Sequence, residues 1–471
     1  MDSIKLASQI EHFWAESVIP TLSEFIKIPA KNAVFDAQWQ NNKHLECAAN
    51  LVGNWISEQQ LLKAMVEVIA LKDKTPFLYA EIPGSSPIDK TILFYGHLDK
   101  MPESEGWTEG YSPWKPVLDQ DRLYGRGASD NGCSPFIAVA ALKALEQQSI
   151  PHARCIFLFE CGEENGSPDF SYYIERLKEK IGNPDLIICL DSGGDDFERL
   201  WITNSIRGSI TATLSVAMLQ QAIHSGSFGG ITASTFRIIR QLLARIENAD
   251  TGELLLPELR VEVPAEHKEA LKIAAEAIGT NIIKNIPLLS GSVATSSNPE
   301  VLLHRQTWGS SLAVIGANGL PPIEQAGNVI RPFTTLQLNL RIPPIVKAER
   351  VSAALKKTFE TDHPYGAKVS FTTTAEANGW VMPKMSSWLS CVINNVAKQY
   401  FKGQVIYRGE GGAIHPISIL SNKFAKAQFV VMGTNCVGAN IHGPDEFLHL
   451  PTAKKLSCAV AHILAEHYKL S

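Results

Sequence analysis

The sequence predicts an α/β protein in two parts: a mixed, mostly parallel sheet with helices on both faces, and an inserted α/β sandwich of the ferredoxin-like type. Between Thr91 and Asp191, short apolar runs alternate with helical patterns, which is typical of parallel strands joined by crossover helices. A helix, an apolar run and a helix return in that order near the C-terminus. Between these regions, polar and apolar residues alternate as in half-exposed antiparallel strands.

The first region contains three predicted strands that are almost wholly apolar, as strands buried on both faces are. They are TILFYGH (91–97), CIFLFEC (155–161) and LIICLD (186–191), and the helices between them are SPFIAVAALKALEQQ (134–148) and SYYIERLKEKI (171–181). In the first 29 residues, charges interrupt every apolar stretch. We therefore expect an amphipathic helix there, and neither a signal peptide nor a membrane span.

The other predicted elements divide the chain into a first catalytic part (1–205), an inserted domain (206–381) and a second catalytic part (382–471). The inserted domain should hold antiparallel strands at 208–218, 334–344 and 367–377 and helices at 232–246 and 346–360. The second catalytic part should hold helices at 385–401 and 451–468 with a strand at 428–433, completing the same sheet. The segment 248–319 shows one Ala-rich helix, and we assign it no function.

Composition excludes several classes of protein. A chain of 471 residues is long enough for two or three domains. Its formal net charge of −5, without a block of like charges, argues against nucleic acid and an acidic membrane surface as partners. The eight cysteines form no C-x-x-C pair, which fits reduced thiols and a cytoplasmic location.

Potential metal ligands follow the predicted strands, at the sheet edge where open α/β sheets carry their sites. These residues are His97 and Asp99, Glu163 and Glu164, Asp191, and His442 in IHGPDE, with Asp130 lying in GRGASDNG before a helix. Each has an ordinary alternative: a hydrogen-bonded loop histidine, solvated surface charge, or a carboxylate that caps a helix or turn. Taken together, imidazole and carboxylate ligands without thiolates predict a two-metal site.

Two geometric expectations follow from the spacing alone. His97 and Asp99 are two residues apart, so in extended backbone both side chains leave on one side, and the carboxylate can orient a metal-bound imidazole. Glu163 and Glu164 are adjacent and should diverge, one toward the metal and one toward the substrate.

The motifs GHLD, GRGASDN, EENGS, LDSG and IHGPDE, in this order, resemble the metal motifs of a metallopeptidase family. That family includes carnosinase, cytosolic nonspecific dipeptidase, the acetylornithine and succinyl-diaminopimelate deacylases, and aminoacylase. The resemblance extends over most of the chain. The stretch IHSGSFGG (223–230) is similar to the H-S-G-x-F-G-G of the dipeptidase branch, although alone it would read as a Gly-rich hairpin loop.

The resemblance implies roles for these positions. His97 and Asp191 would bind one metal ion, Glu164 and His442 the other, and Asp130 would bridge both. Asp99 would orient His97, Glu163 would be the general base, His224 would stabilise the oxyanion, and the peptide bond between Asp130 and Asn131 would be cis. The ions would be Zn²⁺, with Mn²⁺ as the alternative.

Substrate contacts are implied in the same way. Asn328, Arg341 and the turn formed by Glu410, Gly411 and Gly412 fall where the branch binds the ends of a dipeptide; Arg341 could instead form a strand-end salt bridge, and the turn could be only flexible. Cys133 stands where the family commonly has Gly, and we interpret it as a small core residue. Ala413 stands where the branch often has a hydroxyl, so the sequence leaves the carboxylate contact there undefined.

The predicted function is hydrolysis of dipeptides or short peptides by a metal-activated water. The alternatives are an N-acyl-amino-acid deacylase with the same metals and base, and a non-catalytic binding homologue. Glu410 favours a cationic amine and hence a dipeptide. The resemblance further implies a homodimer, in which the inserted domain acts as lid and dimerisation domain and His224 and Asn328 complete the partner subunit's active site.

Overall fold

The computed structural model describes residues 1–61, 63–85, 89–412 and 414–470, and the chain forms two compact units. Unit 1 comprises Met1–Thr203, Met382–Arg408 and Ile414–Ser471, and unit 2 comprises Asn204–Val381 with Gly409–Ala413. The predicted boundaries did not include the short segment Gly409–Ala413 in the inserted domain. Ala413, at which the sequence left the carboxylate contact undefined, lies outside the described residues.

The sheet of unit 1 has six strands in the order β1-β2-β6-β3-β7-β17. Its strands are β1 (Met65–Ile69), β2 (Phe77–Ile82), β6 (Arg154–Glu160), β3 (Thr91–His97), β7 (Leu186–Cys189) and β17 (Gln428–Val431). β3 runs parallel to both β6 and β7, and β17 runs parallel to β7, whereas β1 and β2 are antiparallel. The predicted mixed, mostly parallel sheet is confirmed, and the C-terminal strand completes it.

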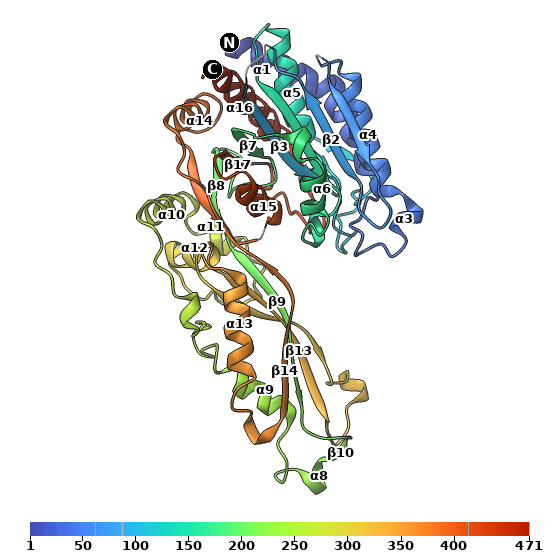
Figure 1. Cartoon of the computed structure of the whole chain (residues 1–471), viewed down its shortest axis with the longest axis vertical. Helices are drawn as coiled ribbons and strands as arrows, with labels where there is room; N and C mark the ends of the chain where they lie inside the picture. Colours follow the sequence, from blue (N-terminus) through green and yellow to red (C-terminus); the bar gives the residue numbers. More distant parts are fainter. Residues whose placement is uncertain (62, 86–88, 413, 471) are drawn as a thin grey trace. The chain divides into compact units, whose positions relative to one another are not determined.

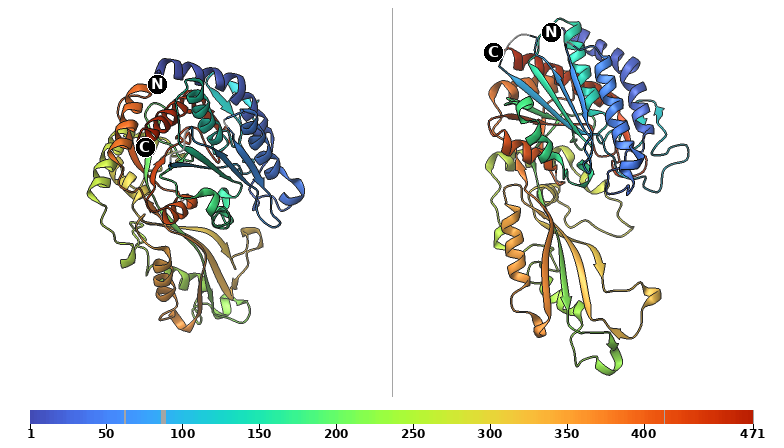
Figure 2. Two further views of the ribbon diagram at one scale, coloured as in Figure 1. Left: turned by 45° about the horizontal axis from the view of Figure 1, so that its top comes forward. Right: turned by 45° about the vertical axis from the view of Figure 1, so that its right-hand side comes forward.

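Helices cover both faces of this sheet (Figures 1 and 2). Successive side chains of β3 point to opposite faces, so Phe94 stacks on Phe157 with ring centroids 4.9 Å apart, while Tyr95 meets the edge of Phe170 at 5.3 Å. Phe170 begins α6 (Phe170–Arg176). α5 (Ser134–Gln147) covers the other face, and it is apolar nearly all round because it also packs against α16 (Leu450–Tyr468).

The remaining elements of unit 1 complete these layers. The helices are α1 (Ser3–Phe13), α2 (Ile19–Lys27), α3 (Trp39–Asn42), α4 (His44–Glu58), α7 (Lys178–Ile181), α14 (Ser387–Tyr400) and α15 (His415–Lys423). A small sheet in the order β18-β5-β4 contains β18 (Phe447–His449), β5 (Arg122–Tyr124) and β4 (Val117–Asp119). Two further strands, β8 (Trp201–Ile206) and β16 (Ile406–Glu410), run from unit 1 into unit 2, and β15 (Trp380–Val381) pairs with β8.

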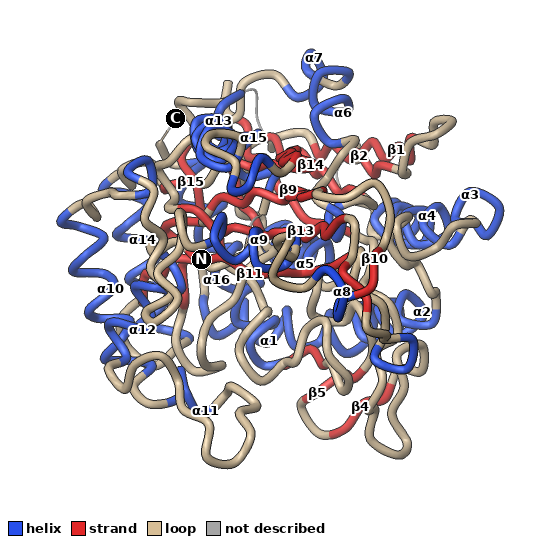
Figure 3. The backbone as a smooth tube through the Cα atoms, turned by 90° about the horizontal axis from the view of Figure 1, so that it is seen from below, coloured by secondary structure: helices blue, strands red, loops and turns tan. Residues whose placement is uncertain are grey.

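Unit 2 is built on an antiparallel sheet of four strands (Figure 3). Its order is β11 (Ser311–Asn318), β13 (Phe333–Ile342), β9 (Gly208–Ala217) and β14 (Lys368–Ala377). In β9, buried residues such as Ile210 and Leu214 alternate with half-buried Thr and Ser, and the buried side packs against α9 (Thr235–Leu243) and α13 (Ala348–Phe359). This is the predicted α/β sandwich.

Shorter elements of unit 2 carry the loops. They are β10 (Ile223–His224), α8 (Ser225–Phe228), α10 (Ala265–Ile278), α11 (Asn281–Lys284), α12 (Pro299–Thr307) and β12 (Val329–Ile330). In neither unit do the described residues include a helix both long enough and apolar enough to span a bilayer.

Candidate metal centre

The predicted ligands lie at one edge of the unit 1 sheet. His97 ends β3, Asp191 follows β7, and Glu164 lies in a short 3₁₀ turn after β6. Because these three strands are parallel, their carboxyl ends meet. Asp130 comes from the turn before α5, and His442 comes from the loop before β18.

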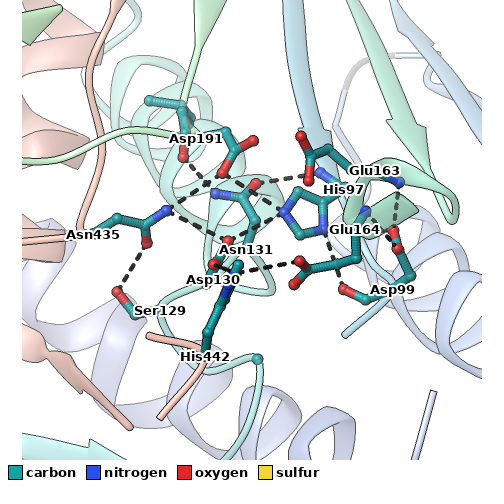
Figure 4. A network of polar contacts seen from close by, with 12 residues as sticks. His97, Asp99, Ser129, Asp130, Asn131, Glu163, Glu164, Asp191, Asn435 and His442 are labelled. Carbon is teal, nitrogen blue, oxygen red and sulfur yellow. Dashed lines mark hydrogen bonds and ion pairs between the residues drawn. The ribbon is translucent and has the colours of Figure 1, made fainter. Parts of the chain in front are cut away.

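Asp130 lies between the two histidines (Figure 4). Its Oδ1 is 3.2 Å from His97 Nε2, and its Oδ2 is 2.9 Å from His442 Nε2. Asp191 Oδ1 lies 3.6 Å from His97 Nε2, and Glu164 Oε2 lies 3.2 Å from His442 Nε2. The five side chains thus form two groups of three that share Asp130 and could each hold a metal ion.

The donor atoms suit divalent cations. Glu164 Oε1 is buried without a hydrogen-bond partner in the described structure, an arrangement that costs free energy unless a cation or other donor meets the oxygen. Both groups offer imidazole nitrogen and carboxylate oxygen and no sulfur, which suits Zn²⁺ or Mn²⁺. The residues therefore fit a pair of such ions.

The protonation states of these side chains depend on one another. Burial lowers the pKa of His442, but hydrogen bonds to Asp130 and Glu164 outweigh burial and raise that pKa to about 11. Burial also lowers the pKa of His97, and the Asp191 and Asp130 carboxylates raise it well above its ordinary value. Both imidazoles of the metal-free protein therefore hold a second proton at neutral pH, which a metal ion would displace.

The pKa values of the carboxyl groups shift in different directions. Burial raises the pKa of Asp130, yet hydrogen bonds to His442 and His97 bring it below its ordinary value. Burial, together with the Asp130 charge, raises the pKa of Glu164 to about 7. Burial also raises the pKa of Glu163 well above its ordinary value. Burial thus favours the protonated form of both glutamates in the metal-free protein.

Asp99 holds the turn that carries the two glutamates. Its carboxylate accepts hydrogen bonds from the backbone N–H of Glu163 (3.1 Å) and Glu164 (3.0 Å) and from the side-chain amide of Asn32 (2.7 Å). His97 Nδ1 lies 3.1 Å from the Asp99 carbonyl oxygen and 3.5 Å from its carboxylate. Asp99 thus contacts His97 mainly through its backbone and orients the turn through its side chain, a contact that the sequence did not predict.

Two asparagines contact the proposed ligand residues. The peptide bond between Asp130 and Asn131 is cis, as the resemblance predicted, and the Asn131 side chain accepts a hydrogen bond from His97 N (3.3 Å). Asn435 Nδ2 donates to Asp130 and to Asp191, each at 3.4 Å. Sequence reasoning missed Asn435, although it follows β17 and the same strand-end rule applies to it.

The predicted substrate contacts lie in unit 2. Arg341 lies near the end of β13. Burial lowers its pKa, although the negative charge of Glu410 acts in the opposite direction. Glu410 accepts hydrogen bonds from the backbone of Gly411 (2.9 Å) and Gly412 (3.5 Å), and Arg207 Nε donates to the Gly411 carbonyl (3.2 Å). The turn is thus held by Arg207, which the sequence did not single out.

His224 caps α8. Its Nδ1 accepts hydrogen bonds from Gly226 N (3.1 Å) and Ser227 N (3.2 Å), which places the imidazole proton on Nε2 in the neutral ring. The neighbouring backbone carbonyl of Asn328 accepts a hydrogen bond from Ser225 N (2.9 Å). The ring therefore satisfies its own loop through one nitrogen and keeps Nε2–H as an exposed donor.

Comparison with known proteins shows the family of this chain. The family model described as peptidase family M20/M25/M40 matches residues 93–466. The chain belongs to this family. The match confirms the predicted metallopeptidase family and enzyme class, and it spans every proposed metal ligand.

The individual relatives within this family share less than 30% identity with the chain over the longer matches. The chain is 24% identical over 397 residues to a cysteinylglycine-S-conjugate dipeptidase of Corynebacterium striatum, covering 80% of this chain and 81% of that protein. It is 28% identical over 293 residues to the human Beta-Ala-His dipeptidase, covering 60% of this chain and 56% of that protein. The structure of human carnosine dipeptidase 1 superposes with a TM-score of 0.76 at 20% identity, covering 99% of this chain and 100% of that one, which confirms the fold.

Proposed function

We propose that this M20 family member is a dipeptidase with two divalent metal ions, Zn²⁺ in the first instance and Mn²⁺ as the alternative. His97 and Asp191 would hold one ion, Glu164 and His442 the other, and Asp130 both. The observation that carries the proposal is the shared carboxylate, whose two oxygens face different histidines at 3.2 and 2.9 Å.

When bound, a pair of such ions can lower the pKa of a water to about 7 and polarise the scissile carbonyl. Glu163 would take the proton from the attacking water and deliver it to the departing amine nitrogen. The hydrogen bond from its backbone N–H to Asp99 supports this role, because it holds the turn that carries Glu163 beside the proposed ligands.

Unit 2 would supply the substrate contacts. His224 Nε2–H would donate to the oxyanion, an interaction worth about 3 to 4 kcal/mol where single donors of this kind have been removed. Asn328, Arg341 and the turn Glu410–Gly412 would bind the two ends of the peptide, with Glu410 meeting the cationic amine. In this proposal unit 2 also pairs with its copy in a homodimer, so that His224 and Asn328 serve the partner subunit.

One assay tests the activity. Purified protein is stripped with a chelator, reloaded with Zn²⁺ or Mn²⁺, and assayed against a panel of dipeptides and matched N-acetyl amino acids. We expect turnover of dipeptides, loss on chelation and recovery on reloading. Preferential turnover of N-acetyl amino acids would establish the deacylase instead, and full activity of metal-free protein would refute the metal-dependent reaction.

A further inference from the structure

A buried ion pair lies beside the metal centre without belonging to it. Arg126 Nη1 is 2.7 Å from Glu446 Oε2, and the two side chains are 1% and 0% exposed. Burying two charges is costly unless their other hydrogen-bonding groups are also satisfied. The partners of each side chain therefore show what the pair organises.

Glu446 organises the turn that carries the shared ligand. Its Oε1 accepts hydrogen bonds from three backbone N–H groups, those of Gly127 (3.0 Å), Ser129 (3.2 Å) and Asp130 (3.2 Å). Gly127 has a φ of +78°, and a Cβ there would lie 2.8 Å from Lys100 Cε, so the tight turn depends on glycine. One carboxylate thus fixes the backbone up to and including Asp130.

Arg126 organises two other loops. Its Nη2 donates to the carbonyl of Gly443 (2.9 Å), next to His442, and to Ser104 Oγ (3.1 Å). Ser104 Oγ in turn donates to the carbonyl of His442 (3.0 Å). Arg126 Nε donates to the carbonyl of Pro102 (3.1 Å), in the loop that follows β3. One guanidinium therefore joins the loop after β3 to the loop of His442.

We propose that Arg126 and Glu446 are positioning residues that hold Asp130 and His442 at the separation a metal ion requires. The inference rests on the proposed function, because it assumes that these two residues are ligands. Neither charged side chain is among the proposed ligands. Glu446 acts through the backbone of the Asp130 turn, and Arg126 acts through the Gly443 carbonyl and the Ser104 hydroxyl. The ligand group of Asp130, Glu164 and His442 depends most on the pair. Glu446 fixes the turn of Asp130, and Arg126 fixes the loop of His442.

Arg126→Lys tests this, because lysine keeps the positive charge beside Glu446 but lacks the planar fork that joins the loop after β3 to the loop of His442. Co²⁺ is titrated into the stripped full-length protein and followed by its visible absorption. We expect one Co²⁺ to bind as in wild type and the second about 10- to 100-fold more weakly, the cost typical of losing a group that orients a metal ligand. Ser104→Ala removes only a hydroxyl on an exposed residue. It should weaken the binding of the same second Co²⁺, by a smaller factor.

The matched control is Arg154→Lys. Arg154 forms a two-pronged pair with Glu81 (2.7 and 2.8 Å) that joins β2 to β6 and contacts no metal-ligand loop. This variant should lower the melting temperature and leave both Co²⁺ affinities unchanged.

Wild-type Co²⁺ affinities and spectra in Arg126→Lys and Ser104→Ala, with only the melting temperature reduced, would overturn the proposal. If circular dichroism shows that Arg126→Lys does not fold, unchanged Co²⁺ binding by Ser104→Ala alone overturns it. Failure of the proposed function gives a different result, because wild-type protein would then bind no Co²⁺.

Discussion

Glu163 and Glu164 are neighbours in the chain, yet only Glu164 forms an ion pair with a described residue, His442 at 3.2 Å. This difference predicts different consequences for two isosteric changes. Glu163→Gln removes a proton acceptor and should lower kcat by roughly 10²- to 10⁴-fold while both metal ions are retained. Glu164→Gln should instead release one ion. Metal analysis and kcat, measured on the same samples, check this, and a Glu163→Gln protein that sheds metal would reverse the two assignments.

The histidine protons predict a pH dependence of metal binding. In the metal-free protein the pKa of His442 is raised to about 11, and that of His97 lies well above its ordinary value, so both rings are doubly protonated near neutrality. A metal ion must displace one proton from each ring, so affinity should fall as pH falls, by about one log unit per pH unit for each displaced proton. Calorimetry of Zn²⁺ binding in buffers with different ionisation enthalpies measures the released protons. Affinity that does not change with pH would contradict the coordination of both rings.

The strand-end rule predicted which residues meet at the centre but not what supports them. His97, Asp130 and Asp191 were found because the sequence places them after apolar runs or before a helix. Asn32 and Glu446 were missed, since neither follows a predicted parallel strand. Asn32 reaches the site through the Asp99 carboxylate, and Glu446 reaches it through the backbone of the turn that carries Asp130. Such support has no local sequence pattern, because its partners are distant along the chain.

Among the elements, the 3₁₀ turn Glu163–Asn165 depends on one carboxylate. The Asp99 carboxylate accepts hydrogen bonds from two backbone N–H groups of that turn, one on each oxygen. In Asp99→Asn one oxygen becomes an NH₂ donor facing an N–H, so the turn should shift. We expect a fall of about 10- to 100-fold in kcat, with KM changed less.

Asp169→Asn is the control for this change. Asp169 also accepts a backbone N–H, from Thr75 at 3.0 Å, but it contacts neither glutamate. The Asp169→Asn variant should lower the stability of the protein and leave kcat unchanged. Equal kcat values in the two variants would show that Asp99 has no particular role in orienting the turn.

The elements that were predicted and those that were missed differ in burial. β3, β6 and β7 are buried on both faces, so an unbroken apolar run marks each one. β11 is an edge strand of the unit 2 sheet and is mostly exposed. Its apolar residues therefore do not alternate regularly with polar ones. Strands without a buried face carry no periodic signal, which is why part of 248–319 could not be interpreted.

At the scale of the whole molecule, the proposed active site draws on both units. All five proposed metal ligands belong to unit 1, whereas His224, Asn328 and Arg341 belong to unit 2. In the proposed homodimer, His224 of one subunit serves the metal centre of the other. A two-fold axis would make the two sites equivalent.

Subunit mixing tests this arrangement. Glu163→Gln inactivates the centre of its own subunit, and His224→Ala removes the donor given to the partner, so each homodimer should be nearly inactive. In a mixed dimer, the Glu163→Gln centre also lacks the partner's donor, while the other centre keeps its base and receives an intact His224. Activity should therefore reappear on mixing, at about half the wild-type value per mixed dimer, because a two-fold dimer has two equivalent sites. Exchange is verified with differently tagged chains. If exchange is complete and activity stays absent, or if the protein is fully active as a monomer, His224 acts within its own chain or only caps its loop.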